Sequence, residues 1–424
     1  MTDARDLRPR DRSRAHDLVL YGATGFTGRL VAEYLLEHYG DSDLRFALAG
    51  RNEGKLQRVR SELARKWPKA AELPTLVADS RDRAALDAIT EATSVLCTTV
   101  GPYAKYGAEV VASCAEHGTD YCDLTGETLF IHRMMKAHHE RAVETGARIV
   151  NCCGYDSIPS DLGTLMVQAA AMEKHGTPCR EVKYFAGETS GGASGGTLAS
   201  GFHMAEEIQR DPSVRRVMGD PYALDPPGGS RGLDGADQRG MRHDADLNQW
   251  TAPFVMAGIN TRVVRRSHAL AGYPWGRDFR YSEVMSTGGG HKGFVRAAVT
   301  TLGLGAFVTG MALPFTRRIL QRRLAQPGEG PSESAREKGY FVVRLLGLGR
   351  DGEGRPFTVR AKVRGEKDPG YGSTAIMLGE AAVCLALDGH ALEGEGGLGT
   401  PASTMGQTLV QRLRDAGMTF AIES

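Results

Sequence analysis

Three glycines near the start of the chain have a spacing that could serve phosphate binding. Gly22, Gly25 and Gly28 recur at every third position in "VLYGATGFTGRLVAEYLL", between a strand-like apolar run and a helix-like run. In a strand–turn–helix unit, glycines let backbone N–H groups approach a pyrophosphate, and the positive end of the helix adds attraction. The spacing GxxGxxG differs from the usual GxGxxG, so the strand–turn–helix context carries the prediction of a dinucleotide site.

Each glycine is expected to act differently. Gly22 permits the tight turn, Gly25 lets the backbone come close to the pyrophosphate, and Gly28 lets the helix pack on the strand. Three neighbours in the same loop are assigned to cofactor binding with them, two of which bring hydroxyl donors: Thr24, Phe26 and Thr27. The alternative is a glycine turn that serves packing alone.

The second strand-like run ends in "ALAGRNEGK", which places Arg51 at its tip with Asn52 and Lys55 close behind. An NAD site usually offers an acidic side chain to the ribose hydroxyls here, whereas an NADP site offers arginine. Glu53 lies beyond the usual place of that acid, and a guanidinium can hold a 2′-phosphate through two hydrogen bonds. The sequence therefore predicts NADP(H) rather than NAD(H). The alternative is that Arg51 is a solvated surface charge.

The next two strand ends are expected to supply further contacts to the same cofactor. Asp79 and Ser80 end the third strand-like run, where they could contact the adenine. The fourth run ends in "TTVGPY", and we expect this segment to pass the nicotinamide ribose. The residues of this segment assigned to the cofactor are Val100, Gly101 and Pro102.

Strand-like and helix-like runs alternate through the first third of the chain, and these elements would position the loops. The strand-like runs are 17–22, 44–50, 74–79, 94–100, 119–124 and 147–154. Apolar strands that alternate with helices are typical of a parallel, doubly wound sheet. Later strand-like runs alternate as antiparallel strands do. We therefore predict an α/β protein with an N-terminal Rossmann sheet and a second α+β domain that has a mixed or antiparallel sheet.

The length of 424 residues favours two domains. Residues 1–15 are predicted to be a disordered tail without the features of a secretory signal. Residues 16–155 are predicted to form the Rossmann domain, and 156–370 a substrate- or acyl-binding domain. The remainder, 371–424, begins with a strongly apolar helix-like run.

Composition excludes several classes of function. Lys and Arg number 52 against 51 Asp and Glu, so a formal net charge of +1 gives no reason to expect nucleic acid as a partner. The seven cysteines are odd in number and have no CxxC spacing, so we expect neither a disulfide framework nor a metal site. Such cysteine usage fits a reducing, cytoplasmic compartment.

One apolar stretch needs separate interpretation. "AAVTTLGLGAFVTGMALPF" spans 297–315 without a charge, within an apolar helical segment near 294–323. About 20 apolar residues cross a bilayer, so this stretch is short for a span. Three interpretations remain open: a buried helix or wall for an acyl chain, a helix on a membrane surface, or a true span. The first two suggest an apolar substrate.

Six longer strings carry a resemblance to a known family. They are "YGATGFTGRL", "ALAGRN", "TTVGPYAKYG", "GTDYCDLTGE", "CGYDSIPSDLG" and "SGGTLASG". Together they resemble the saccharopine dehydrogenase-like oxidoreductases, and most closely the actinobacterial branch called trans-acting enoyl reductases. The resemblance extends over nearly the whole chain.

The resemblance implies a Rossmann domain, a second α/β domain, and a C-terminal helical segment within 371–424 that packs back on the first domain. It implies NADPH-dependent enoyl reduction of a lipid or polyketide acyl thioester. The partner would be an acyl or lipid-linked small molecule carried by a polyketide synthase. A peripheral contact with the plasma membrane and a homodimer remain open.

Enoyl reduction needs a proton for the α-carbon and donors for the thioester oxygen. Tyr103 is the first choice as proton donor or oxyanion partner, and a wall of the nicotinamide pocket is the alternative. Asp156 could be a general acid or a helix cap, and Ser157 stands beside it. Further donors in the same loops or the glycine-rich loop are Lys105, Tyr106, Tyr155, Ser160, Ser194 and Thr197.

Two other functions remain open from the sequence. One is a non-catalytic lipid- or membrane-associated protein that keeps the Rossmann fold. The other is an amino-acid dehydrogenase of saccharopine type, which needs a cationic pocket for two carboxylates. Arg262, Arg265 and Arg266 are the candidates for that pocket, although they could equally form a solvated face or a membrane-facing patch.

Overall fold

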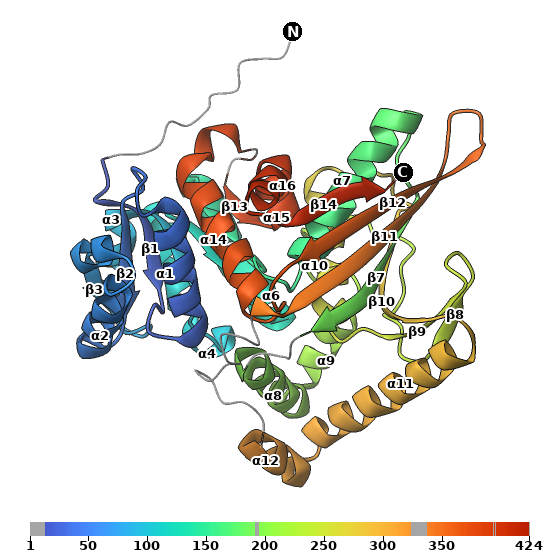
Figure 1. The fold of residues 1–424 in the computed structure, drawn as a ribbon, viewed down its shortest axis with the longest axis horizontal. Helices are drawn as coiled ribbons and strands as arrows, with labels where there is room; N and C mark the ends of the chain where they lie inside the picture. Colours follow the sequence, from blue (N-terminus) through green and yellow to red (C-terminus); the bar gives the residue numbers. More distant parts are fainter. Residues whose placement is uncertain (1–12, 191–194, 324–336, 393, 395, 424) are drawn as a thin grey trace. The chain divides into compact units, whose positions relative to one another are not determined.

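The computed structural model describes residues 13–190, 195–323, 337–392, 394 and 396–423 (Figure 1). The chain forms two compact units and passes between them several times. The first unit comprises the chain up to Thr125 together with Arg133–Tyr155 and Tyr371–Ala416. The second comprises Gly126–His132, Asp156–Gly370 and the residues from Gly417 on.

Seven parallel strands form the sheet of the first unit, in the order β13-β6-β5-β4-β1-β2-β3. This is the predicted doubly wound sheet, and the fold class is confirmed. Because β1 lies between β2 and β4, the loops that follow these three strands meet at one edge of the sheet. The strands are β1 (His16–Tyr21), β2 (Phe46–Gly50), β3 (Thr75–Val77), β4 (Thr93–Thr98), β5 (Asp120–Asp123), β6 (Arg148–Val150) and β13 (Gly397–Gly399).

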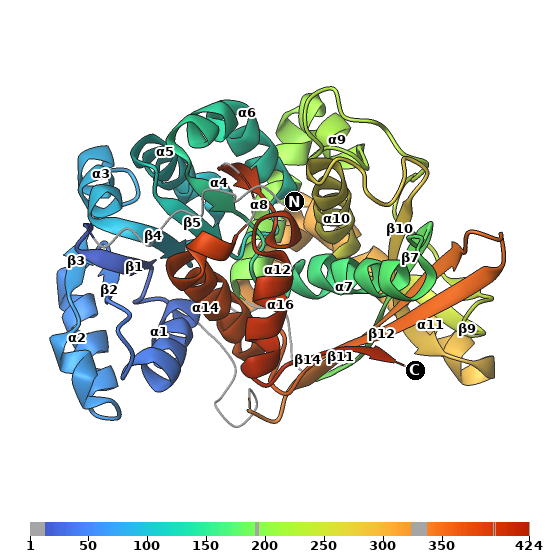
Figure 2. The ribbon, with the colours of Figure 1, turned by 90° about the horizontal axis from the view of Figure 1, so that it is seen from above.

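Helices cover both faces of this sheet. Figure 2 shows α1 and α14 on one face and α3 and α5 on the other. The helices are α1 (Phe26–Tyr39), α2 (Glu53–Ala64), α3 (Arg83–Ala92), α4 (Tyr103–Tyr106), α5 (Ala108–His117), α6 (Thr128–Thr145), α14 (Gly372–Leu387), α15 (Pro401–Thr404) and α16 (Gly406–Asp415), with short 3-10 turns at Pro68–Glu72 and Gly389–Ala391. The first residues of α6 belong to the second unit.

A buried carboxylate fastens the C-terminal helices to the N-terminal part of this unit. Glu380 of α14 accepts hydrogen bonds from the hydroxyls of Tyr34 (2.5 Å) and Tyr39 (2.6 Å) on α1. Arg412 of α16 forms an ion pair with the same carboxylate at 3.3 Å. The apolar run at the start of 371–424 is therefore α14, and it packs against α1.

The division of the chain differs from the expected boundaries at three places. Arg14, expected in the disordered tail, donates hydrogen bonds to the carbonyls of Thr90 and Thr93, so the ordered unit begins before His16. Residues 126–132 belong to the second unit. The C-terminal segment is not purely helical, because β13 joins the first sheet and β14 (Thr419–Glu423) joins the second.

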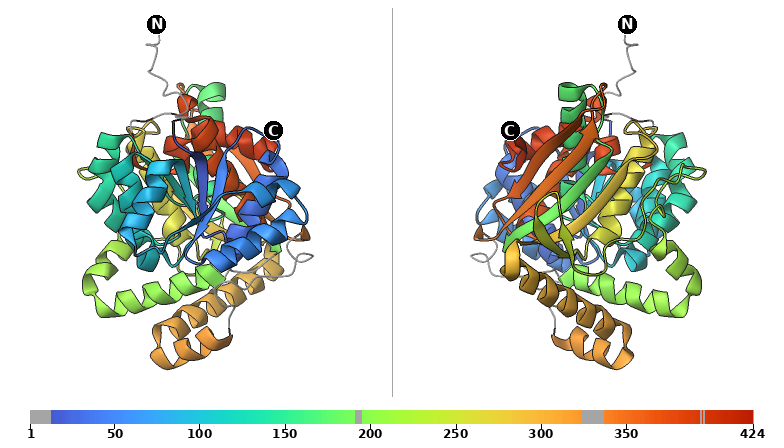
Figure 3. Two further views of the ribbon diagram at one scale, coloured as in Figure 1. Left: turned by 90° about the vertical axis from the view of Figure 1, so that its left-hand side faces the viewer. Right: turned by 90° about the vertical axis from the view of Figure 1, so that its right-hand side faces the viewer.

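The second unit is built on a mixed sheet in the order β14-β12-β11-β7-β10-β9-β8, whose strands face the viewer in the right-hand view of Figure 3. β7 and β10 pair in parallel, whereas the other pairs are antiparallel. The strands not yet given are β7 (Glu181–Ser190), β8 (Arg242–Asp244), β9 (Gln249–Pro253), β10 (Arg280–Gly288), β11 (Tyr340–Arg350) and β12 (Pro356–Gly365).

Helices α7 and α10 pack against this sheet, and α11 contacts its strands β9 and β10. The helices of the unit are α7 (Ile158–His175), α8 (Gly195–Arg210), α9 (Pro212–Gly219), α10 (Ala257–Leu270), α11 (Gly290–Ala312) and α12 (Pro314–Arg323). The glycine-rich stretch 190–201, expected to be a loop, enters α8 at Gly195. Gly191–Ser194 lie outside the described residues, as does the expected donor role of Ser194, and the side chain of Thr197 is likewise not described.

The three arginines of α10 are buried, which contradicts a solvated or membrane-facing patch. Arg262 forms an ion pair with Asp237 at 3.0 Å, and Arg265 forms one with Asp234 at 2.8 Å. Arg266 donates to the carbonyl of Leu224. These guanidinium groups fasten the long segment after α9 to the unit. They are therefore already occupied and do not form a pocket for two carboxylates.

The apolar stretch 297–315 is mostly exposed, so its interpretation as a plain core helix was wrong. It forms most of α11, a helix that is long and apolar enough to cross a membrane by length and composition. Only 6% of the most apolar 18-residue stretch of this helix is buried. Gly293 and Ala297 are its buried residues. A soluble helix normally turns charged residues to solvent, whereas α11 has no charged residue after Arg296.

A chain of buried polar groups runs behind the start of α7. Ser157 donates to Asn260 Oδ1 (3.0 Å), and Asn260 donates to Glu283 Oε2 (2.9 Å). Tyr281 donates to the other oxygen of Glu283 at 2.8 Å. Burial raises the pKa of the Glu283 carboxyl to about 7, because no basic side chain pairs with it among the residues described.

This network predicts a pH-dependent stability. The folded state holds the Glu283 proton more tightly than the unfolded state, so the free energy of unfolding falls as pH rises from about 4.5 towards about 7. The loss amounts to about 3 kcal/mol. Glu283→Gln, which cannot ionise, is expected to show a smaller loss of melting temperature between about pH 5 and about pH 8. The exposed Glu188→Gln serves as the control, and equal pH dependence in both variants would contradict the assignment.

Candidate functional site

The turn after β1 is crowded at its first and last glycines. Gly22 has a φ of +94°, and a Cβ there would lie 2.7 Å from both Thr99 Oγ1 and Val100 Cγ2. A Cβ on Gly28 would overlap the carbonyl oxygen of Gly22. Gly22 and Gly28 thus allow β1, α1 and the end of β4 to approach closely, as the sequence predicted for the turn and for helix packing.

Gly25 is the least crowded of the three glycines. It is exposed, its backbone is extended (φ −80°), and the nearest heavy atom to a Cβ there is the carbonyl oxygen of Gly22 at 3.3 Å. Helix α1 begins at the next residue, and its first N–H groups have no partner within the helix. No acidic residue lies in the first turn. This place suits a pyrophosphate, so the loop fits the predicted dinucleotide.

The other loop residues lie around this opening. Thr24 and Thr27 are half-buried. Phe26 is also half-buried, and its ring packs edge-on against Tyr371 with the ring centroids 4.7 Å apart. Arg29 in the first turn of α1 is paired with Glu33 and with Glu62 of α2, so its charge is partly neutralised.

The end of β2 presents an exposed cation. Arg51 follows Gly50 directly, and no hydrogen bond or ion pair holds its side chain among the residues described. Asn52 has a local task instead, because its Oδ1 accepts from the N–H of Lys55 (2.8 Å) and caps α2. Lys55 itself is exposed. Arg51 is therefore the side chain at this strand end that is free to bind a 2′-phosphate.

The end of β3 lies beside the same edge. Asp79 is exposed, and its Oδ1 accepts from the N–H of Arg81 at 3.0 Å, which shapes the turn. Ser80 is buried. Tyr21 at the end of β1 donates to the carbonyl of Ala78 (3.1 Å), and burial together with the charge of Asp79 raises its pKa to about 12.

The end of β4 gives Tyr103 a structural task. Its hydroxyl donates to the carbonyl of Thr98 (3.1 Å) and accepts from the N–H of Leu124 (3.4 Å), and the side chain is buried. In this geometry the Tyr103 hydroxyl donates its proton to the Thr98 carbonyl, whereas the sequence predicted that it would donate to a substrate. Val100, Gly101 and Pro102 precede it, with a cis peptide bond between Gly101 and Pro102, and Gly101 is exposed.

Asp123, which is not among the residues predicted from the sequence, organises the neighbouring strand ends. Its carboxylate is fully buried and accepts four hydrogen bonds, at distances of 2.8–3.1 Å. The donors are the Tyr121 hydroxyl, the Asn151 amide, and the backbone N–H groups of Thr125 and Cys152. Burial nevertheless raises its pKa to about 6. An acidic residue closing an apolar strand in "DYCDLTG" was the available signal.

Asp156 opens the second unit with an unusual carboxyl group. It follows Tyr155, the last residue of the first unit before the chain crosses. The residue is half-buried, and within the described residues its carboxyl makes neither a hydrogen bond nor an ion pair. The partial loss of solvent raises the pKa of this carboxyl to about 7. The side chain does not cap α7, because no side-chain cap is formed there and the N-cap position belongs to Ser157.

Ser157 is held in a strained backbone conformation. Its φ is +98°, a region that side-chain-bearing residues rarely adopt, and its hydroxyl is fully buried and engaged with Asn260. Strain of this kind persists only where the surroundings impose it, and it is commonly found at functional sites. The hydroxyl of Ser157 thus donates within the fold, to Asn260, beside Asp156.

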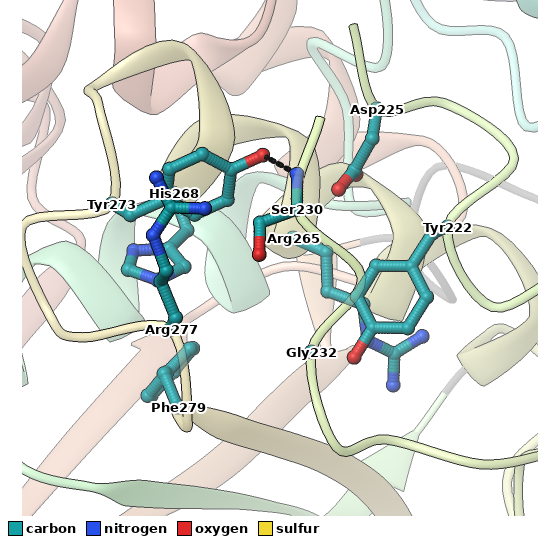
Figure 4. Close-up of a pocket in the computed structure, with 9 residues that line it drawn as sticks. All are labelled: Tyr222, Asp225, Ser230, Gly232, Arg265, His268, Tyr273, Arg277 and Phe279. Carbon is teal, nitrogen blue, oxygen red and sulfur yellow. Dashed lines mark hydrogen bonds between the residues drawn. The ribbon is translucent and has the colours of Figure 1, made fainter. Parts of the chain in front are cut away.

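A separate pocket lies within the second unit (Figure 4). Its cavity of about 10 Å³ holds roughly one water molecule. Tyr273 closes one side, where its hydroxyl accepts from the N–H of Ser230 at 2.6 Å. This pocket is too small for an acyl chain. Its lining residues are Tyr222, Asp225, Ser230, Gly232, Arg265, His268, Tyr273, Arg277 and Phe279.

The contrast between two glycines gives a test of the loop. Gly25→Val is expected to lower NADPH affinity by more than about 100-fold, because the branched side chain fills the opening, while the melting temperature changes little. Gly28→Ala is expected instead to destabilise the fold by about 1–3 kcal/mol. Nicotinamide fluorescence titration and thermal melting separate the two effects. Normal NADPH binding by Gly25→Val would reject the loop as the phosphate site.

Arg51 gives a test of cofactor choice. Arg51→Ala is expected to weaken NADPH by about 10- to 100-fold and NADH hardly at all, because only NADPH carries the 2′-phosphate. Arg58→Ala, an exposed arginine on α2, should leave both affinities unchanged. An equal loss for both cofactors in Arg51→Ala would contradict the 2′-phosphate role.

Comparison with known proteins agrees with this site. Residues 18–150 match the saccharopine dehydrogenase NADP binding domain family, a range that contains the glycine loop and Arg51. A solved structure of saccharopine dehydrogenase (L-Glu forming) from Saccharomyces cerevisiae covers 96% of this chain and 99% of its own, with a TM-score of 0.53 and 14% identity. At that identity the likeness shows the fold alone.

Three curated relatives match nearly the entire chain. Trans-acting enoyl reductases of Mycobacterium bovis and Mycobacterium ulcerans are each 38% identical to it, over 96% of this chain and 97% and 98% of their own. A Mycobacterium tuberculosis protein whose name gives the same activity provisionally is 40% identical over 96% of this chain and 97% of its own. The chain, an NADP(H)-dependent oxidoreductase, therefore belongs to the trans-acting enoyl reductase family of saccharopine dehydrogenase-like proteins.

Proposed function

We propose that the protein reduces the carbon–carbon double bond of an α,β-unsaturated acyl thioester and that Asp156 is the proton donor. The observation that carries the proposal is the Asp156 carboxyl, which has no hydrogen-bond or ion-pair partner among the described residues and whose pKa burial raises to about 7. Within the first unit, the glycine loop and Arg51 suit NADPH. The names of the curated relatives support the reaction class.

The reaction needs an electron pair at the β-carbon and a proton at the α-carbon. Bound NADPH supplies the hydride. The chain must hold the acyl group at the carboxyl edge of the first sheet and offer an acid whose pKa lies near the working pH. Asp156, with a pKa of about 7, meets the second requirement, because it is protonated often enough to donate and recovers its proton from water readily.

The other two catalytic candidates fit positioning roles better. The hydroxyl proton of Tyr103 is directed to the Thr98 carbonyl, and that of Ser157 is directed to Asn260. Both side chains are buried. In this proposal Tyr103 holds the loop after β4 to the loop after β5, and Ser157 fixes the backbone next to Asp156.

The source of the substrate is also part of the proposal. We infer that the thioester is carried on a polyketide synthase, because the relatives are named as acting in trans. A carrier-bound chain would be presented to the open edge of the sheet by a long flexible arm. A cytoplasmic location belongs to the same proposal, because all seven cysteines are free and buried, as suits a reducing compartment.

The test uses trans-2-enoyl thioesters on coenzyme A and on a carrier-protein pantetheine arm, followed by NADPH oxidation. Asp156→Asn is expected to lower kcat by at least about 100-fold while the NADPH dissociation constant stays the same. The wild-type rate should fall as pH rises through about 7, where the Asp156 carboxyl loses its proton.

Tyr103→Phe separates positioning from catalysis. This variant is expected to lower the melting temperature and to keep the wild-type pH profile, because its hydroxyl joins two loops. If Asp156→Asn kept full kcat on an accepted substrate, Asp156 would be excluded as the acid. If NADPH bound but every enoyl thioester was refused, enoyl reduction itself would be rejected.

A further inference from the structure

The pair of helices α11 and α12, residues 290–323, lies at the outside of the second unit (Figure 1). Several of its apolar side chains are exposed. Along α11, Val295, Val299 and Leu302 are exposed at spacings of four and three residues, which place them on one face of the helix. Leu313, directly after α11, is also exposed. Leu302 is 74% exposed, and Phe315 at the start of α12 is 76% exposed. Isolated surface leucines are ordinary, whereas a continuous uncharged face marks an interaction surface.

The opposite side of α11 is fastened to the unit at both ends. Near its start, Phe294 packs edge-on against Trp250 of β9 with the ring centroids 5.0 Å apart, and Thr287 donates to the carbonyl of Gly293 at 3.0 Å. At its far end, Gln209 of α8 donates to the carbonyl of Ala312. The helix therefore lies along the unit and does not project from it.

The charges carried by α11 and α12 themselves have one sign, although Arg317 of α12 is paired with Glu206 of α8 at 3.9 Å. No Asp or Glu occurs from Val284 to Gly328, whereas six Lys and Arg residues do. Lys292 and Arg296 are exposed near one end of α11, and Arg318 is exposed on α12. Apolar residues between exposed cations are complementary to a surface that is apolar inside and anionic outside, which is the chemistry of a bilayer with acidic lipids.

The contacts at both ends of α11 decide whether this helix can cross a bilayer or only lie on its surface. With 23 residues, α11 is about 35 Å long and could span a membrane by length. A span would have to break the contacts of Phe294 and Ala312 and carry the ends of the helix to opposite sides of the bilayer. Since both ends are fixed to the same folded unit, the apolar face can enter only the headgroup and upper acyl region.

We propose that the α11–α12 surface docks the protein on an anionic membrane, with the axis of α11 in the membrane plane. Val299, Leu302 and Phe315 enter the interface, while Lys292, Arg296 and Arg318 contact lipid phosphates. This inference does not depend on enoyl reduction, because it uses no residue of the proposed site.

The test uses the full-length protein and vesicles of phosphatidylcholine, with and without phosphatidylglycerol. The wild type is expected to float with the phosphatidylglycerol vesicles and to bind them less well as salt is added. The double variant Val299→Glu with Leu302→Glu should bind at least about tenfold more weakly, because two charges replace exposed apolar contacts. Both positions are exposed, so the melting temperature and NADPH affinity should stay at wild-type values.

Leu233→Glu provides the matched control, since Leu233 is 66% exposed in the same unit but outside α11 and α12. It is expected to bind vesicles as the wild type does. The proposal is overturned if the wild type floats with neither vesicle or if Leu233→Glu loses as much binding as the double variant. It is also overturned if light scattering shows a wild-type dimer that the double variant dissociates, because the surface would then cover a second copy.

Discussion

The fully buried carboxylate of Asp123 is the interaction on which the edge of the first sheet depends. Four donors converge on it from β5, from the loop after β5 and from the loop after β6. Thr125 and Cys152, which give two of these donors, lie just before the points where the chain leaves the first unit. A single buried acceptor thus fixes the backbone from which Asp156 follows. A buried carboxylate that accepts several hydrogen bonds costs less free energy than one without hydrogen bonds. Moving any of these segments would therefore leave a buried acceptor unsatisfied.

The less exposed carboxyl groups of this protein are of two kinds: some are paired with an arginine, and others have no cation beside them and a raised pKa. Asp234 and Asp237 lie beside Arg265 and Arg262, and these ion pairs fasten the segment after α9. Asp156 and Glu283 have no such cation among the described residues, and burial raises the pKa of each to about 7. The first pair serves architecture. Asp156 and Glu283 have raised pKa values. Asp156 directly precedes Ser157, the only described serine with a positive φ.

The second unit places cations inside and apolar residues outside. The arginines of α10 are buried because the acidic segment after α9 folds over them. The apolar face of α11 is exposed because no segment of the described chain covers it. Both arrangements reverse the usual distribution, in which charged residues are exposed and apolar residues are buried. Arg262 and Arg265 are paired with acidic residues of the chain. For the apolar face of α11, we propose a membrane as the partner.

The sequence by itself determined the Rossmann sheet, the glycine turn and the cofactor, because these depend on local patterns: alternating apolar runs, glycines at fixed spacing and the residue type at a strand end. It also determined the family, through long shared strings. Asp156 was recognised as a candidate because it follows a strand, but sequence left acid and helix cap equally open.

Only the tertiary structure decided the rest, because burial and pairing depend on residues far apart in the chain. The Tyr103 hydroxyl donates to the Thr98 carbonyl and accepts from the Leu124 N–H, contacts that the sequence did not reveal. Arg262 and Arg265 pair with Asp237 and Asp234, 25 and 31 residues earlier in the chain. β13 escaped notice since Gly397–Gly399 has no strand-like composition and pairs only because β6 offers an edge. A run of apolar residues looks the same in a core and on a surface, so the exposure of α11 could be known only once the second sheet was in place.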